Sequence, residues 1–160
     1  MNTNPGNLVE SKHVRRGAVL LLRFGLGTAF LSAVADRFGL YGPHGAKGAS
    51  WGDFAHFIDY TRTLTGFVPS SVTPTLAWMA TLLETLFGVL LLLGFRTRAS
   101  AFASAILLLS FALAMSLAEA GPHSAFIHSV FSAAGGALLL SAVPETIWSV
   151  DALLSKGRSS

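Results

Sequence analysis

The sequence contains no cysteine, so the chain itself cannot form a disulfide, supply a thiolate nucleophile or ligate an iron–sulfur cluster. Charge is scarce as well: Asp, Glu, Lys and Arg make up only 12% of the 160 residues, against roughly 25% in soluble domains. The scarcity is uneven, because residues 99–118 carry no charged side chain. Such a run can span the hydrocarbon core of a bilayer, which needs roughly 20 residues. These absences indicate an integral membrane protein.

Apolar runs of this kind recur along the chain, and we expect one all-α domain covering residues 1–160. The predicted architecture is an integral membrane four-helix bundle with short interfacial amphipathic helices. Pro74 fits the first turn of a helix, and Gly121-Pro122 and Pro144 are helix breakers that end two of the runs. The predicted spans are residues 17–35, 75–95, 99–118 and 124–143, with an external loop over residues 36–74.

The net charge of +3 predicts topology rather than nucleic-acid binding, because the basic residues form no long stripe. With four spans, one side of the membrane carries seven flanking basic residues and the other side carries three. The larger group is Lys12, Arg15, Arg16, Arg96, Arg98, Lys156 and Arg158, and the smaller group is Arg37, Lys47 and Arg62. Basic residues accumulate on the cytoplasmic side. We therefore expect an inner-membrane protein with both termini in the cytoplasm.

The second half of the external loop has the pattern of an interfacial helix, because Trp51, Phe54, Ile58 and Leu64 recur near helical spacing. Asp53, His56 and Asp59 lie between them at intervals of three. Two carboxylates and one histidine are weak support for a metal site. We interpret them as a solvated face with an Asp59–Arg62 pair and predict no metal site.

Two charged residues lie inside the predicted spans, Arg23 in the first and Glu84 in the second. Either would be costly alone at membrane depth. Counted from the inner ends of the spans, they lie roughly 9 Å and roughly 16 Å deep, a gap that a long arginine can close. Gly27 and Gly88, one turn away from each, leave room for a large side chain opposite. We predict an intramembrane Arg23–Glu84 ion pair, which either fixes the helix register or lines a polar pocket.

These residues resemble the DoxX family of small membrane proteins. The resemblance covers about residues 17–143 and rests on two segments, Leu22-Arg23-Phe24-Gly25-Leu26-Gly27 and Glu84-Thr85-Leu86-Phe87-Gly88, followed by a Gly94-Phe95-Arg96-Thr97-Arg98 turn. It implies a four-helix membrane bundle. Relatives include a subunit of a thiosulfate:quinone oxidoreductase and accessory parts of redox or maturation systems. The absence of cysteine argues against a thiol-based role.

Other polar residues at similar depth extend the predicted pocket. Its lining would comprise Gly27, Gly88, Trp78, Thr81, His128 and Ser132, with Ser32 and Asp36 at the end of the first span. Trp78 is more typical of an interface anchor than of a stacking residue. His128 is more typical of a hydrogen-bonded bundle residue than of a proton carrier.

Three functional hypotheses follow. The first is a membrane subunit or accessory factor of a quinone-linked redox system, at most part of an oxidoreductase, with a protein partner and a non-covalently bound quinone. The second is a transporter or permeability factor for a small solute, which intramembrane charge would suit. The third is a structural or assembly subunit without chemistry. All three place the chain in the lipid bilayer, and none involves nucleic acid.

Overall fold

The computed structural model describes residues 5–118, 125–143 and 148–156. They form six helices and, within these ranges, no strand. The helices are α1 (Pro5–Arg37), α2 (Phe54–Leu64), α3 (Thr73–Leu93), α4 (Thr97–Ala118), α5 (Ala125–Ala142) and α6 (Val150–Lys156). The all-α prediction is confirmed.

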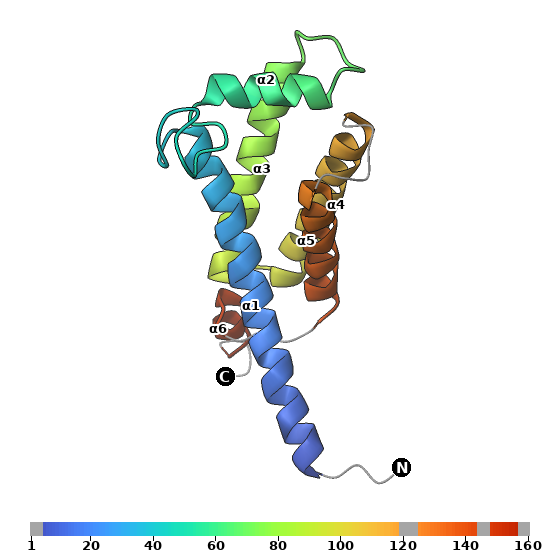
Figure 1. Ribbon diagram of the computed structural model, residues 1–160. Helices are drawn as coiled ribbons and strands as arrows, with labels where there is room; N and C mark the ends of the chain where they lie inside the picture. Colours follow the sequence, from blue (N-terminus) through green and yellow to red (C-terminus); the bar gives the residue numbers. More distant parts are fainter. Residues whose placement is uncertain (1–4, 119–124, 144–147, 157–160) are drawn as a thin grey trace.

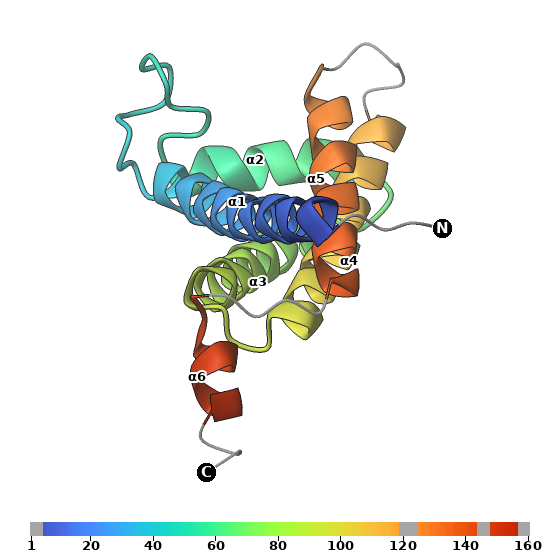
Figure 2. The ribbon, with the colours of Figure 1, turned by 90° about the horizontal axis from the view of Figure 1, so that it is seen from below.

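The long helices are arranged as two antiparallel pairs, α1 with α3 and α4 with α5 (Figure 1). Helix α2 lies across one end of the α1–α3 pair and contacts both α3 and α4. Helix α6 lies at the opposite end and extends away from the bundle (Figure 2). The chain therefore has one end built from α2 and its loops and another where α1 begins and α6 is placed.

Three helices are long and apolar enough to cross a membrane: Lys12–Arg37 within α1, Thr73–Leu93 and Thr97–Ala118. The described apolar part of α5, Ser129–Ala142, is shorter than a span requires. The prediction of an integral membrane protein is supported, whereas the fourth span and the complete four-helix bundle stay predictions.

Side-chain burial follows the pattern of a membrane protein, with small residues between helices and large apolar residues outside. Ala101, Ala105 and Ala112 of α4 and Ala134 and Ala137 of α5 are buried. Large outward side chains are exposed along the same lengths, among them Leu82, Leu113 and Leu138. Small residues let helix backbones approach closely where lipid, rather than water, surrounds the bundle.

Helix ends bring distant parts of the chain together. Gly94 ends α3 in the left-handed conformation, at φ 65°, and its N–H caps the preceding carbonyls. Thr97 then begins α4, and the backbone N–H groups of Thr97 and of Arg96 just before it donate to the carboxylate of Asp151, at 2.8 and 2.7 Å. Helix α4 is thus capped by a residue just inside α6.

The predicted topology can be tested directly. Reporter fusions at residues 97 and 160 are expected to report the cytoplasm, and a fusion near residue 50 the opposite side, because basic residues concentrate around the first two positions. Alkaline phosphatase and fluorescent-protein fusions measure the two sides in complementary ways. An external signal at residue 160 would contradict an even number of spans.

Candidate functional site

A buried ion pair lies where α2 covers the α1–α3 pair. Arg37, the last residue of α1, places Nη1 2.6 Å from Oε2 of Glu84 in the middle of α3. The same nitrogen donates to Oγ1 of Thr81, one turn earlier, at 2.9 Å. Both charged side chains are about 95% buried or more. The pair joins two helices at a depth where neither charge could remain alone without a large cost.

Aromatic rings cover the guanidinium from the side of α2. The Arg37 Cζ lies 3.7 Å from the centroid of the Phe57 ring and 5.2 Å from that of Trp51. These distances fit cation–π contacts, which strengthen when the cation is shielded from water. Phe57 is one of the two buried residues of α2. Arg37 therefore holds α2 as well as α3.

Asp36, the neighbour of Arg37, fixes the loop that carries Trp51. Its Oδ2 accepts the backbone N–H groups of Ser50 and Trp51 at 2.9 and 3.0 Å, and its side chain is buried. Hydrogen bonds from backbone N–H groups to a carboxylate are among the stronger ones in proteins. The last two residues of α1 thus organise the loop, α2 and α3 around one point.

Glu84 therefore pairs with Arg37 in the structure, which corrects the predicted Arg23–Glu84 partnership. The reason is the helix register. A Cβ added to Gly27 would lie 3.1 Å from the carbonyl oxygen of Gly88, so the two glycines face each other where α1 and α3 cross. Arg23 and Glu84 each precede their own glycine by one turn. In antiparallel helices they lie on opposite sides of the crossing, roughly 12 Å apart along the axes at 1.5 Å per residue.

Arg23 belongs to a second cluster, at the other end of α3. It is 1% exposed and donates from Nη2 to the carbonyl oxygen of Trp148 at 2.5 Å. Gly94 lies against the same guanidinium, because a Cβ there would be 2.9 Å from Nη1. Asp151 adds a further link, since its backbone N–H donates to the Gly94 carbonyl at 3.1 Å. Arg23 and Asp151 together fasten the segment before α6 to the bundle.

Replacing Asp151 by Ala is expected to lower the free energy of unfolding by about 1 kcal/mol, because the first N–H groups of α4 lose their acceptor. Asn should cost less, since it also caps helices well. The comparison is thermal unfolding in detergent together with limited proteolysis after residue 148. Equal stability and equal cleavage in wild type and Asp151→Ala would contradict the capping role.

The other residues that were predicted to line the pocket lie in different parts of the structure. Gly27 and Gly88 form the crossing itself, and a Cβ on either would lie 2.8–2.9 Å from Leu92 or Leu31, so the crossing leaves no room for a pocket. Thr81, predicted to line the pocket, instead accepts a hydrogen bond from Arg37 in the buried cluster. Trp78 is half exposed and packs on Phe54, with ring centroids 4.3 Å apart, as suits an interface anchor.

Two of the residues predicted to line the pocket, His128 and Ser132, belong to α5. Ser132 lies on an exposed part of the helix. The side chain of His128 lies outside the described residues.

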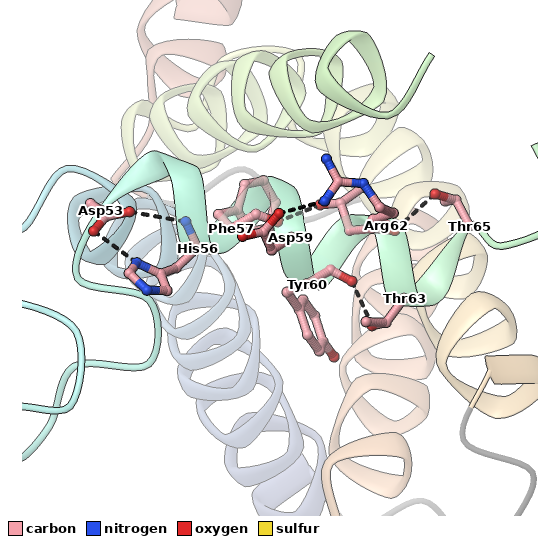
Figure 3. A network of polar contacts seen from close by, with 9 residues as sticks. Asp53, His56, Phe57, Asp59, Tyr60, Arg62, Thr63 and Thr65 are labelled. Carbon is pink, nitrogen blue, oxygen red and sulfur yellow. Dashed lines mark hydrogen bonds and ion pairs between the residues drawn. The ribbon is translucent and has the colours of Figure 1, made fainter. Parts of the chain in front are cut away.

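The polar face of α2 carries the pairs shown in Figure 3. Arg62 and Asp59 form the predicted exposed ion pair, at 2.6 Å. Asp53 caps α2 by accepting the N–H of His56 at 2.9 Å, and its second oxygen lies 2.8 Å from Nδ1 of the same histidine. Among the described residues, no group of three or more His, Cys, Asp or Glu side chains is placed to hold a metal ion.

Sequence reasoning missed Arg37 as a site residue because it was assigned to the external flank. A usable signal was present. No helix breaker separates Ala35 from Arg37, so α1 could continue, and Gly27 and Gly88 mark the one level where the two backbones can touch. From that level, only an arginine further along α1 can reach Glu84.

A comparison with known families matches residues 15–126, from α1 to the start of α5, to a family described as methylamine utilisation protein MauE. No curated protein and no solved structure matches the chain. The finding corrects the DoxX resemblance, which rested on an Arg in the first span, a Glu in the second and the Gly94-Phe95-Arg96-Thr97-Arg98 turn, short segments that do not define the family by themselves. Since the match covers more than half of the sequence, the chain belongs to the MauE family of membrane proteins.

Proposed function

We propose that this chain is a membrane-embedded accessory protein of a redox-related system, and that it works with protein partners in the use of methylamine. The observation that carries the proposal is the family match, because residues 15–126 include both halves of the Arg37–Glu84 cluster, the loop and α2. The chain has no cysteine, so thiol chemistry in such a system would be supplied by a partner.

The geometry favours an accessory role over a quinone or solute site between α1 and α3. A quinone or solute pocket between α1 and α3 was expected to use Arg23 and Glu84 together, and these residues lie on opposite sides of the helix crossing. The backbones of α1 and α3 meet at Gly27 and Gly88, so little space is left between Arg23 and Glu84. What the Arg37 cluster does instead is to hold α2 and its loop in a fixed position on the bundle. Such a rigid cap is suited to presenting a surface to a partner at one side of the membrane.

Deleting the gene in the organism that carries it tests the proposal. Growth on methylamine as the nitrogen source is expected to be lost, and growth on ammonium to be unchanged. A plasmid copy should restore growth, as should an Arg62→Gln copy, which removes only an exposed pair. An Arg37→Gln copy should restore it poorly. Immunoblotting of membranes separates loss of protein from loss of function. A deletion strain that grows normally on methylamine would refute the proposal.

A further inference from the structure

An open groove lies at the end of the bundle opposite to α2, between the last residue of α3 and the segment that leads into α6 (Figure 1). Its volume is about 380 Å³, and it is lined by Leu93, Trp148, Ser149, Val150, Ala152 and Leu153. All of these side chains except that of Ser149 are apolar. Trp148 is nevertheless 82% exposed and Leu153 69% exposed. The groove is separate from the Arg37 cluster, and its assignment does not depend on the proposed function.

The backbone beside the groove holds a tryptophan at the surface in a strained conformation. Trp148 has φ 44°, in the left-handed region that bulky residues rarely adopt. Its carbonyl oxygen accepts a hydrogen bond from Nη2 of the buried Arg23, and the next residue, Ser149, is buried as well. A strained conformation persists only where the surrounding contacts determine it. These contacts fix the main chain, so the exposure of the indole ring is built into the fold.

Arg96 is a second exposed residue held in the same way. Its φ is 46°, and its backbone N–H donates to Oδ1 of Asp151 at 2.7 Å. The backbone N–H of Asp151 donates in turn to the carbonyl oxygen of Gly94, the residue that follows the groove-lining Leu93. Within the described part of the chain, the Arg96 guanidinium lies 6.0 Å from the Phe95 ring and pairs with no carboxylate. A cation and an indole ring thus come from the two segments that form the groove.

The groove lies where the apolar part of the bundle ends. Helix α3 is apolar along Thr73–Leu93, a length that can cross a membrane, and its last residue lines the groove. Exposed Arg15 and Arg16 come two turns before Arg23 on α1, roughly 10 Å further out along the axis. The carboxylate of Asp151 is occupied by two backbone N–H groups, so basic side chains set the charge around the groove. Tryptophan and arginine at this level are typical of the boundary between hydrocarbon and lipid headgroups.

We propose that this groove binds one anionic phospholipid of the surrounding leaflet. The Arg96 guanidinium holds the phosphate, because its planar donors match phosphate oxygens in pairs. The indole of Trp148 lies beside the glycerol backbone, and one acyl chain runs along Leu93 and Leu153. The charge of Arg96 favours a lipid with a net negative charge over a zwitterionic one. The bound lipid then joins α6 to the end of α3 and to the leaflet.

Trp148 itself can report the lipid, because bromine atoms on an acyl chain quench the fluorescence of a tryptophan that they contact. The full-length protein is reconstituted in phosphatidylcholine vesicles that contain a small fraction of brominated phosphatidylglycerol, or the same fraction of brominated phosphatidylcholine. Trp148→Phe retains Trp51 and Trp78, so its signal gives the background to subtract. Stronger quenching of Trp148 by brominated phosphatidylglycerol is expected, and the ratio of the two apparent affinities defines the preference for the anionic lipid.

Three variants separate a built site from general surface charge. Arg96→Gln keeps the backbone bond to Asp151 and should lower the preference roughly fivefold, the effect of one basic side chain near an anionic surface. Arg98→Gln removes the same charge two residues later, but Nε of Arg98 donates to the Ser141 carbonyl of α5, so the preference should be nearly unchanged. Ala152→Phe fills the groove without changing the charge and should also lower the preference.

The outcomes that would overturn the proposal are distinct. Equal quenching of Trp148 by the two brominated lipids would mean that the groove contacts lipid without selecting it. An equal loss of preference in Arg96→Gln and Arg98→Gln would assign the preference to diffuse surface charge. No quenching of Trp148 by either lipid would leave the groove to a protein partner. Each of these results would refute an anionic phospholipid site between α3 and α6.

Discussion

Replacing Arg37 by Gln is expected to lower the free energy of unfolding in detergent by about 3–5 kcal/mol, because Glu84 is left as an uncompensated buried charge. Glu84→Gln instead leaves Arg37 as an uncompensated buried charge, because an arginine side chain does not give up its proton in a protein. The two single changes should therefore both destabilise, and the double change should cost less than their sum. Thermal or denaturant unfolding followed by helical circular dichroism measures all four proteins.

Two control pairs are compared with the Arg37–Glu84 double-mutant cycle. Arg23→Gln combined with Glu84→Gln should be additive within roughly 0.5 kcal/mol, as for residues without contact. Arg62→Gln combined with Asp59→Asn should show a coupling of at most about 1 kcal/mol, because that pair is exposed. A coupling between Arg23 and Glu84 that exceeds the Arg37–Glu84 coupling would contradict the register described for α1 and α3.

The second large effect is expected at the helix crossing. Gly27→Ala should destabilise the protein by about 1–3 kcal/mol, because the new Cβ would lie 2.8 Å from Cγ of Leu92 and 3.1 Å from the Gly88 carbonyl oxygen. The leucine can turn aside, whereas the backbone of α3 must move. Gly25→Ala is the control, two residues away in the same helix.

Nothing lies within 4 Å of a Cβ built on Gly25, so that substitution should be neutral or stabilising by up to about 1 kcal/mol, since alanine is the better helix former. The difference between the two variants isolates the close contact from helix propensity. If Gly25→Ala destabilised the protein as much as Gly27→Ala, packing at the crossing could not be the cause.

Much of the fold could be predicted from the sequence because bilayer length and hydropathy act locally. The predicted spans 75–95 and 99–118 differ by only two residues at most from α3 and α4. The first helix extends further than predicted, since the polar residues before Gly17 continue the helix and Arg37 ends it. Composition predicts the apolar segment, whereas α1 extends beyond it at both ends.

The site was predicted only in part because its contacts depend on register. Glu84 and Thr81 were identified, since charge and hydroxyl groups within an apolar run are conspicuous. Their partner could not be found by comparing depths, because these were counted from assumed span ends rather than from the glycine contact. The backbone N–H of Trp51 donates to the carboxylate of Asp36, 15 residues earlier in the chain. No local sequence pattern predicts that these two residues are in contact.

The capping of α4 by Asp151 has a consequence for biosynthesis. The acceptor for the first N–H groups of α4 is encoded 54 residues after Thr97. When α4 leaves the ribosome, those groups have no partner from the chain, and water or the insertion machinery must satisfy them. They meet Asp151 only after α5 has been made. Completion of this helix end is thus postponed until α6 has been synthesised, so a chain that stops before Asp151 would lack the acceptor for these N–H groups.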